Sequence, residues 1–154
     1  MRSTITDWIF QVSQDLKISP DTTASIIAYV DTIFCKVEVS KENLQLVVLS
    51  CLILATKFSE MDNKVPSLAE ASNLCQGLYS VDLFKKAESF ILEQLDWNLR
   101  VISPYQFVHH FLSKGCIFSS DTTAFPHVSS DILRYLRRYS ECFVNLSMDS
   151  YEFN

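Results

Sequence analysis

The stretch LQLVVLSCLILATKF, residues 44–58, decides the fold that this sequence can adopt. Between Leu44 and Ala55 only Gln45 and Ser50 interrupt the apolar residues. The run is too long for one strand and contains no turn signal, which favours a helix despite two adjacent valines. A helix that is apolar on nearly all sides is normally buried at the centre of a domain. At about 12 residues the run is also shorter than the ~20 that cross a bilayer.

The segments on either side of this stretch also have helical spacing of apolar residues or helix-capping residues. Only two glycines and four prolines occur, too few turn residues for a sandwich or a barrel. We expect a first helix from the N-terminus to about Lys17, a second from a cap at Asp21 or Thr22 to about Phe34, and a third over 41–58 after a cap at Ser40. A fourth should run from a capping box at Ser67 and Glu70 to about Cys75, and a fifth over 81–96 after a cap at Ser80. A sixth should run from Ser103-Pro104 to Gly115, and a seventh from about Ser130 to Leu146. A loop is expected over 116–127. The sequence thus predicts an all-α fold: a five-helix bundle around a central buried helix, followed by two further helices.

Composition narrows the classes of function. The net charge of −5 argues against a broad nucleic-acid surface, and the local cluster Arg134, Arg137 and Arg138 is typical of a solvated helix face. Five cysteines, an odd number without a CxxC pair, indicate reduced, buried thiols rather than a disulfide frame or a zinc site. The polar N-terminus does not resemble a signal peptide. We expect an intracellular protein of the nucleus, the cytoplasm or both, with no nucleic acid or membrane among its partners.

The parts that most enzymes need are missing from the sequence. It contains neither GxGxxG nor GxxxxGK, the glycine-rich patterns that cradle phosphates. The adjacent His109 and His110 would point ~100° apart on a helix and would not chelate a metal together. The third histidine, His127, falls in the expected loop. We therefore expect a binding protein that is not an enzyme and has no cofactor and no metal site.

Two of the expected helices carry residues that do not fit a plain bundle. Lys57 ends the central helix, where a lysine would also complement the helix macrodipole. On the fifth helix, Glu88 lies at the border of the apolar stripe and Leu92 lies outside it, so the two share a face that suits a partner. The expected stripe itself consists of Leu83, Phe84, Ala87, Phe90, Ile91 and Leu95.

Several stretches, in order along the chain, resemble the cyclin box. Residues 46–60 resemble its signature, and residues 1–8 (MRSTITDW) resemble the motif with which it begins. Residues 79–99 are similar to its fifth helix and the exit from it, and residues 103–107 (SPYQF) to the link toward a second box. The resemblance covers roughly residues 1–114. It implies an N-terminal cyclin box over 1–100, and a linker with the start of an incomplete second box over 101–154. Val65-Pro66 and Trp97-Asn98-Leu99 resemble the J-type branch of the family.

The resemblance assigns roles to individual residues. Five positions recur in cyclin boxes, and this sequence has the matching residues Arg2, Asp31, Leu46, Lys57 and Glu88. Arg2 and Asp31 would form a buried ion pair between the first two helices, and Leu46 would belong to the core. Lys57 and Glu88 would bond the backbone of a kinase beside its movable regulatory helix. The kinase-binding residues implied in this way are Lys57, Phe58, Glu60, Glu88, Leu92 and Leu99.

The function implied by the resemblance is that of a cyclin-like regulatory subunit. It would form a heterodimer with a cyclin-dependent protein kinase and activate it, in cell-cycle progression or in transcription. Kinase substrates or inhibitors would be further partners. Two alternatives stay open: a transcription-factor-like cyclin fold, against which the negative net charge speaks, and a scaffold that holds a non-kinase protein.

The resemblance also implies a substrate-docking groove for an Arg-x-Leu type motif between the first and third helices. Its matching positions are Met1, Ile5, Trp8, Leu44 and Gln45. Thr4 replaces the usual aliphatic residue and Gln11 replaces an acid that would pair with the arginine, so we expect weak or altered docking. Because the second box is incomplete, the sixth and seventh helices should be partly uncovered. We expect a monomer that is marginally stable or weakly self-associating.

Overall fold

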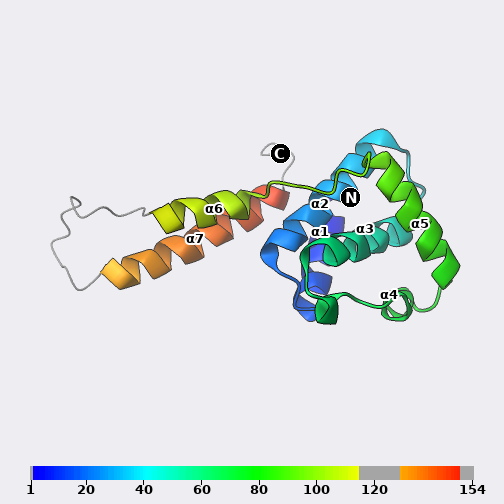
Figure 1. Ribbon diagram of the computed structural model, residues 1–154, viewed down its shortest axis with the longest axis horizontal. Coiled ribbons are helices and arrows are strands. Elements are labelled where there is room, and N and C mark those ends of the chain that lie inside the picture. Colours follow the sequence, from blue (N-terminus) through cyan, green and yellow to red (C-terminus); the bar gives the residue numbers. More distant parts are fainter. Residues whose placement is uncertain (1, 115–128, 150–154) are drawn as a thin grey trace. The chain divides into compact units, whose positions relative to one another are not determined.

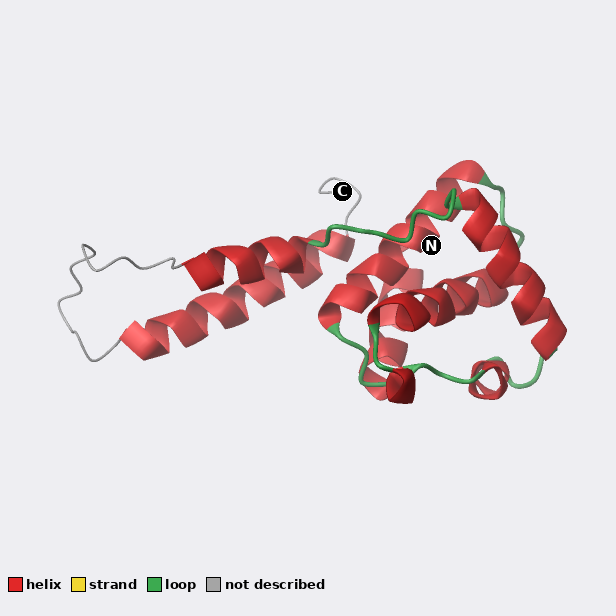
Figure 2. Ribbon diagram, in the orientation of Figure 1, coloured by secondary structure: helices red, strands yellow, loops and turns green. Residues whose placement is uncertain are grey.

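The computed structural model describes residues 2–114 and 129–149. Within these ranges the regular structure is entirely helical, without a strand, so the predicted all-α class is confirmed (Figure 2). The chain divides into two compact units, Met1–Val101 and Ile102–Asn154, which are described separately. The first unit contains α1 (Arg2–Asp15), α2 (Pro20–Lys36), α3 (Leu44–Ser59), the 3-10 turn η1 (Asp62–Lys64), α4 (Leu68–Leu74) and α5 (Val81–Gln94). The second contains α6 (Pro104–Lys114) and α7 (Ser129–Asp149).

Helix α3 is the centre of the first unit. All residues from Leu46 to Thr56 are buried, as the apolar run predicts. The helix packs against α2 and against α5, and it lies between them in Figure 1. The other helices of the unit therefore bury their apolar sides against α3, which has no solvent-facing side over most of its length.

Two predicted helix caps are confirmed and two are wrong. Ser67 and Glu70 form the predicted capping box of α4, and the Ser80 hydroxyl accepts from the backbone N–H of Leu83 at the start of α5. The cap of α2, however, is Ser19 instead of Asp21 or Thr22, because Pro20 already takes the first helical position. Helix α3 begins after Asn43, since the residues that follow Ser40 form a turn.

Several helix ends also differ from the predicted ones. Helix α1 ends at Asp15, and Lys17 has a φ of 55°, the left-handed region that stops a helix. Helix α5 ends at Gln94 instead of Asp96, whereas α7 continues three residues beyond the predicted Leu146. The predicted end of the sixth helix at Gly115 and the predicted loop over 116–127 lie outside the described residues.

The described cysteines fall into two groups. Cys51 and Cys75 are buried and burial raises the pKa of both thiols, as expected of structural cysteines. Cys35 and Cys142 are exposed free thiols, so the expectation of buried cysteines is wrong for these two. Each lies on the exposed side of its helix. The residue type alone does not indicate which side of a helix a cysteine takes.

Candidate functional site

The C-terminal end of α3 and the middle of α5 meet at an ion pair between Lys57 and Glu88. The Lys57 Nζ and the Glu88 Oε1 are 2.5 Å apart. The lysine side chain is 47% exposed and the glutamate side chain 13%. One partner of the pair is thus open to a neighbouring molecule, while the other is held against the protein.

The local structure explains why these two residues meet. Lys57 lies in the last turn of α3, where its charge complements the helix macrodipole. On α5, Phe84 and Ile91 are fully buried, which fixes the rotation of that helix. Since α3 and α5 pack directly on each other, this rotation brings the border position of Glu88 to the end of α3. Sequence reasoning selected both residues but did not foresee that they bond each other.

Apolar side chains accompany the pair on the same two elements. Phe58 follows Lys57 and is 57% exposed, and Leu92 lies one turn beyond Glu88 and is half-buried. Leu99 is half-buried too, and its carbonyl accepts from the Tyr29 hydroxyl, which ties the exit of α5 to α2. The apolar residues that the sequence selected are therefore accessible in part or in full.

Sequence reasoning missed Trp97, an exposed tryptophan in this exit. Trp97 is 71% exposed, and Asp96 and Trp97 both have positive φ values, 53° and 59°. The Lys36 ammonium group holds the backbone there, donating to the Gln94 carbonyl and to the Asp96 carboxylate. The sequence marks Trp97 as part of the family-like exit from this helix, and as a large apolar residue outside any helical stripe, but neither signal indicates its exposure.

The side chain of Glu60 lies at the start of α2 and does not take part in the Lys57–Glu88 pair. Its carboxylate accepts bonds from the Ser19 backbone N–H (2.8 Å), the Thr22 hydroxyl (2.8 Å) and the Lys64 ammonium group (3.2 Å). Burial alone would raise the pKa of Glu60, but these donors outweigh it and lower the pKa to about 2. The side chain is therefore engaged at the start of α2, and its contact with a kinase stays a prediction.

Arg2 and Asp31 form a two-point contact between α1 and α2. The Arg2 Nε and Nη2 atoms donate to the two carboxylate oxygens of Asp31 over 2.9 and 2.8 Å. The two side chains are only 11% and 19% exposed. Leu46, the remaining recurrent position, is buried in the core. All five recurrent positions thus lie in the first unit, three with structural roles and two at the α3–α5 pair.

The residues predicted to line the docking groove differ in their exposure. Ile5 is buried, Trp8 and Leu44 are half-buried, and Gln45 is exposed. Met1 lies outside the described residues. The two departures, Thr4 and Gln11, are exposed on α1. Weak docking of Arg-x-Leu peptides at these positions stays a prediction.

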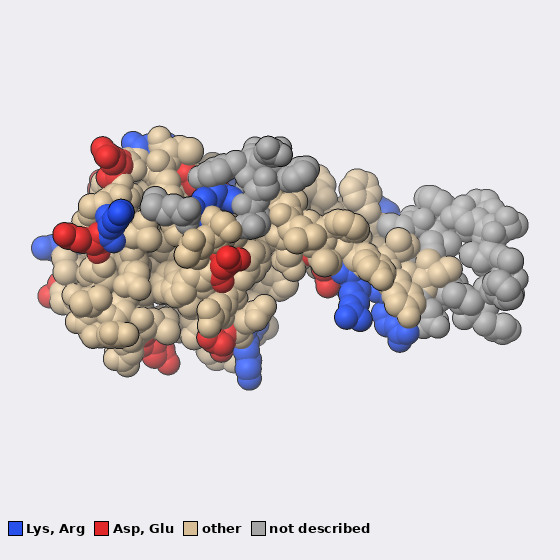
Figure 3. All heavy atoms as spheres, turned by 180° about the vertical axis from the view of Figure 1, so that it is seen from behind, with Lys and Arg blue, Asp and Glu red and all other residues tan. Residues whose placement is uncertain are grey.

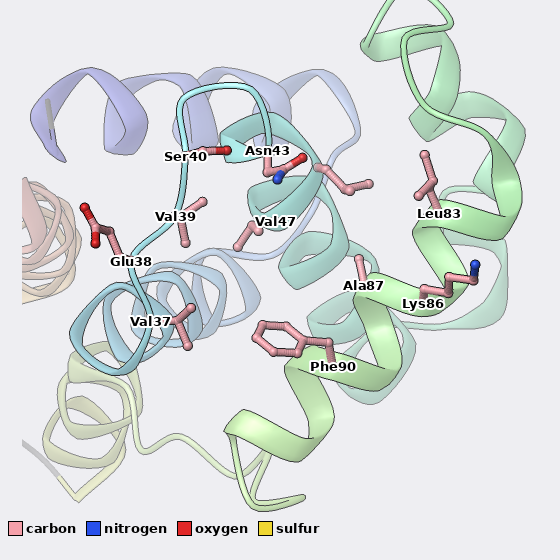
Figure 4. A pocket seen from close by; sticks show the side chains of 11 residues that line it. Val37, Glu38, Val39, Ser40, Asn43, Val47, Leu83, Lys86, Ala87 and Phe90 are labelled. Atoms are coloured by element: carbon pink, nitrogen blue, oxygen red, sulfur yellow. The ribbon is translucent and has the colours of Figure 1, made fainter.

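Another side of α5 borders an open pocket of about 400 Å³ (Figure 4). Phe90 and Val37 point toward the hollow, and Glu38 points away from it. Leu83 and Phe90 are each more than 40% exposed, so the apolar stripe of α5 is only partly buried. The walls are formed by the segment before α3, the first turns of α3, and α5: Val37, Glu38, Val39, Ser40, Asn43, Leu46, Val47, Leu83, Lys86, Ala87 and Phe90.

The described residues hold neither a metal cluster nor a helix that could span a membrane. Within residues 2–114 and 129–149, no three His, Cys, Asp or Glu side chains come together to hold a metal ion. In the same ranges, no helix has both the length and the apolar character that crossing a bilayer requires. Over the first unit, the described surface in Figure 3 shows basic and acidic side chains mixed, without a continuous basic area.

Comparison with known proteins gives a family match and a fold match. The model of the family described as "Cyclin, N-terminal domain" matches residues 1–100. The chain is 32% identical to Cyclin-D of Ostreococcus tauri over 143 residues, 92% of this chain and 38% of that protein. It is 26% identical to Cyclin-J of Xenopus laevis over 159 residues, 99% of this chain and 41% of that protein. The fold is similar to the X-ray structure of a viral cyclin from herpesvirus saimiri, with a TM-score of 0.76 at 14% identity, over 97% of this chain and 60% of that chain.

These matches agree on the family and differ in the branch. D-type and J-type relatives both match, and in each case the chain spans about two fifths of the relative's length, 38% and 41%. The family model covers the whole region that holds the five recurrent positions and the α3–α5 pair. From its fold, its site residues and this match, the chain belongs to the cyclin family.

Proposed function

We propose that this chain is a regulatory subunit that binds a cyclin-dependent protein kinase and activates it. The observation that carries the proposal is the Lys57–Glu88 pair, at the positions where the cyclin family bonds a kinase. Membership of the family and the similarity to proteins named as cyclins support it.

The pair can bond a partner without breaking. An ammonium group has three donors, and Lys57 uses one of them on Glu88, so others are free to meet a backbone carbonyl. The Glu88 carboxylate has a second oxygen that can accept from a backbone N–H. Backbone groups are common to all kinases, so these two residues would supply affinity without distinguishing one kinase from another. The apolar Phe58 and Trp97 would instead distinguish kinases by the shape of the surface that they contact.

Activation would follow from a shift between two kinase conformations. The subunit would bind the active placement of the kinase's regulatory helix more tightly than the inactive one, which raises the population of the active state. That placement completes the lysine–glutamate ion pair of the kinase that positions ATP. The cyclin would contribute contacts and no catalytic group.

Titration calorimetry with a panel of purified cyclin-dependent kinases tests the proposal, with phosphate transfer to a substrate protein as a second readout. Lys57→Ala and Glu88→Ala should each weaken binding by about 1.5–3 kcal/mol, the usual contribution of a hydrogen bond to a charged group. Both variants should keep the wild-type circular dichroism spectrum, because neither side chain lies in the core.

Lys85→Ala and Asp82→Ala form a matched control, because these residues make an exposed ion pair of 3.8 Å on the same helix. They should bind the kinase as wild type does. A wild-type chain that binds no kinase of the panel contradicts the proposal. Kinase binding that survives both Lys57→Ala and Glu88→Ala would show that the pair is not the kinase contact. Salt-dependent DNA binding would favour the transcription-factor-like alternative.

A further inference from the structure

The backbone that follows α5 adopts an unfavourable conformation at two successive residues. Asp96 and Trp97 have φ values of 53° and 59°, in the left-handed region. Residues with a Cβ atom avoid this region, and glycine is the usual residue where a helix ends in this way. Two such residues in a row persist only where the surrounding structure holds them, and backbone of this kind is concentrated at functional sites.

Two backbone hydrogen bonds define the turn at the end of α5. The Asp96 N–H donates to the Glu93 carbonyl over 3.1 Å, and the Trp97 N–H donates to the Leu92 carbonyl over 2.9 Å. This pattern is the Schellman motif, in which glycine normally takes the position of Asp96. The chain makes this turn without the glycine that favours it, so other contacts have to stabilise it.

Helix α2 holds this part of the backbone at two points. Lys36, the last residue of α2, donates from its ammonium group to the Gln94 carbonyl and, over 3.1 Å, to the Asp96 carboxylate. Farther along the chain, the Tyr29 hydroxyl donates to the Leu99 carbonyl. Burial raises the pKa of Tyr29 to about 12, so the hydroxyl keeps its proton at neutral pH and can donate. The backbone is thus bonded to the same helix before and after the left-handed turn.

Of the two contacts, the one made by Lys36 acts on the turn itself. The Lys36 and Asp96 side chains are 42% and 83% exposed, and an ion pair this open to solvent contributes little to global stability. The ammonium group also lies at the C-terminal end of α5, where the helix dipole favours a positive charge. Tyr29, in contrast, is buried in the core. A change at Lys36 should therefore loosen the turn and leave the core intact.

The turn carries a residue of the proposed kinase contact. Trp97 is exposed, and its own backbone belongs to the left-handed pair. A side chain that is held in place before binding does not have to be ordered during association, which strengthens binding. We propose that Lys36 is a positioning residue for kinase binding, which holds the end of α5 so that Trp97 meets the kinase surface. This role rests on the proposed function, and it requires no contact between Lys36 and the kinase.

Hydrogen exchange of the chain alone, followed by NMR at single amides, tests whether Lys36 holds the turn. In Lys36→Met, the amides of Asp96 and Trp97 should exchange at least ~3-fold faster than in the wild type, because the turn opens locally more often. Lys36→Arg keeps a cation with several donors and should restore the protection. The amides of α3 should exchange as in the wild type in both variants, which separates a local change from a loss of global stability. Unchanged exchange at Asp96 and Trp97 in Lys36→Met overturns the role.

Kinase binding tests the consequence, with the member of the kinase panel that binds the wild-type chain most tightly. Lys36→Met should weaken binding ~3–10-fold, the cost of ordering a freed side chain during association, and Lys36→Arg should bind nearly as the wild type does. Lys41→Met removes the same charge from an exposed lysine in the turn before α3, and as the matched control it should leave binding unchanged. Wild-type affinity in Lys36→Met overturns the positioning role.

A double-mutant cycle shows whether Lys36 acts through Trp97. In the Trp97→Ala background, Lys36→Met should weaken binding by less than ~2-fold, because the side chain that Lys36 positions is gone. Equal losses in the two backgrounds would indicate a direct contact or a charge effect, and would overturn the positioning role while the proposed function stands. A wild-type chain that binds no kinase of the panel would contradict the proposed function itself, and the positioning role with it.

Discussion

Among single residues, Glu60 makes stability depend on pH. Its pKa falls from an ordinary 4.5 to about 2 in the folded protein, and its side chain is 6% exposed. Because the folded-state pKa is the lower one, the stabilisation is fully present above pH 4.5 and is lost as the pH falls toward 2. A shift of this size corresponds to about 3 kcal/mol.

Glu60→Gln should therefore lower the free energy of unfolding at pH 7 by about 2–3 kcal/mol. It should also flatten the dependence of that free energy on pH in the acid range. Urea denaturation at a series of pH values measures both effects. Glu93→Gln, an exposed position on α5, should leave the profile unchanged. A parallel profile for wild type and Glu60→Gln would show that Glu60 does not carry the acid sensitivity.

The stability lost when Asp31 is removed depends on its partner, Arg2. Asp31→Ala would leave the Arg2 guanidinium without its two-point contact on a side chain that is 11% exposed. We expect a loss of about 2–3 kcal/mol, below the 3–5 of a fully buried pair, because the carboxylate reaches solvent. Thermal unfolding followed by circular dichroism measures the loss. Melting at the wild-type temperature would mean that the pair contributes nothing to stability.

Trp97 combines an exposed side chain with an unfavourable backbone conformation. A positive φ costs a residue with a Cβ atom about 1–2 kcal/mol, and glycine avoids that cost. Trp97→Gly should therefore be ~1 kcal/mol more stable than Trp97→Ala and no less stable than wild type, because the indole is 71% exposed and contributes little packing. Chemical denaturation of the three proteins measures the difference. If Trp97→Gly is the least stable of the three, the indole packs in the folded state and the backbone explanation fails.

At the scale of helices, the sequence was sufficient where the information is local. The existence of α3 and its central position follow from one apolar run, and the caps Ser67 and Ser80 follow from short motifs. Ser19-Pro20 starts α2 in the same way as Ser103-Pro104 starts α6, so the rule that predicts the second of these starts also applies to the first.

The remaining differences come from contacts between residues far apart in the sequence. Glu60 bonds Ser19, which is 41 positions away, and the sequence around Glu60 does not indicate that partner. Leu83 and Phe90 have the spacing of core residues, but the neighbouring elements cover only the side of α5 that holds Phe84 and Ile91. Helical periodicity gives the apolar side of a helix and leaves open how much of that side its neighbours will cover.

For the whole molecule, the burial of α3 predicts how stability is distributed. Local opening requires little free energy where few buried contacts are lost and nearly the full unfolding free energy in the core. Hydrogen exchange followed by mass spectrometry should find the slowest amides in α3 and faster exchange in α4, which buries only Ala71 along its seven residues. Equal protection of α3 and α4 would contradict a core centred on α3.

The central position of α3 has a further consequence when the protein is made. A ribosome delivers α1, α2 and α3 well before α5, and domains complete their folding only when all their parts have emerged. Until residue 94 is available, the side of α3 that later rests on α5 has nothing of its own chain to cover it. The nascent chain therefore presents one of its most apolar segments during this interval. We expect that stage of synthesis, more than the finished protein, to need the help of chaperones.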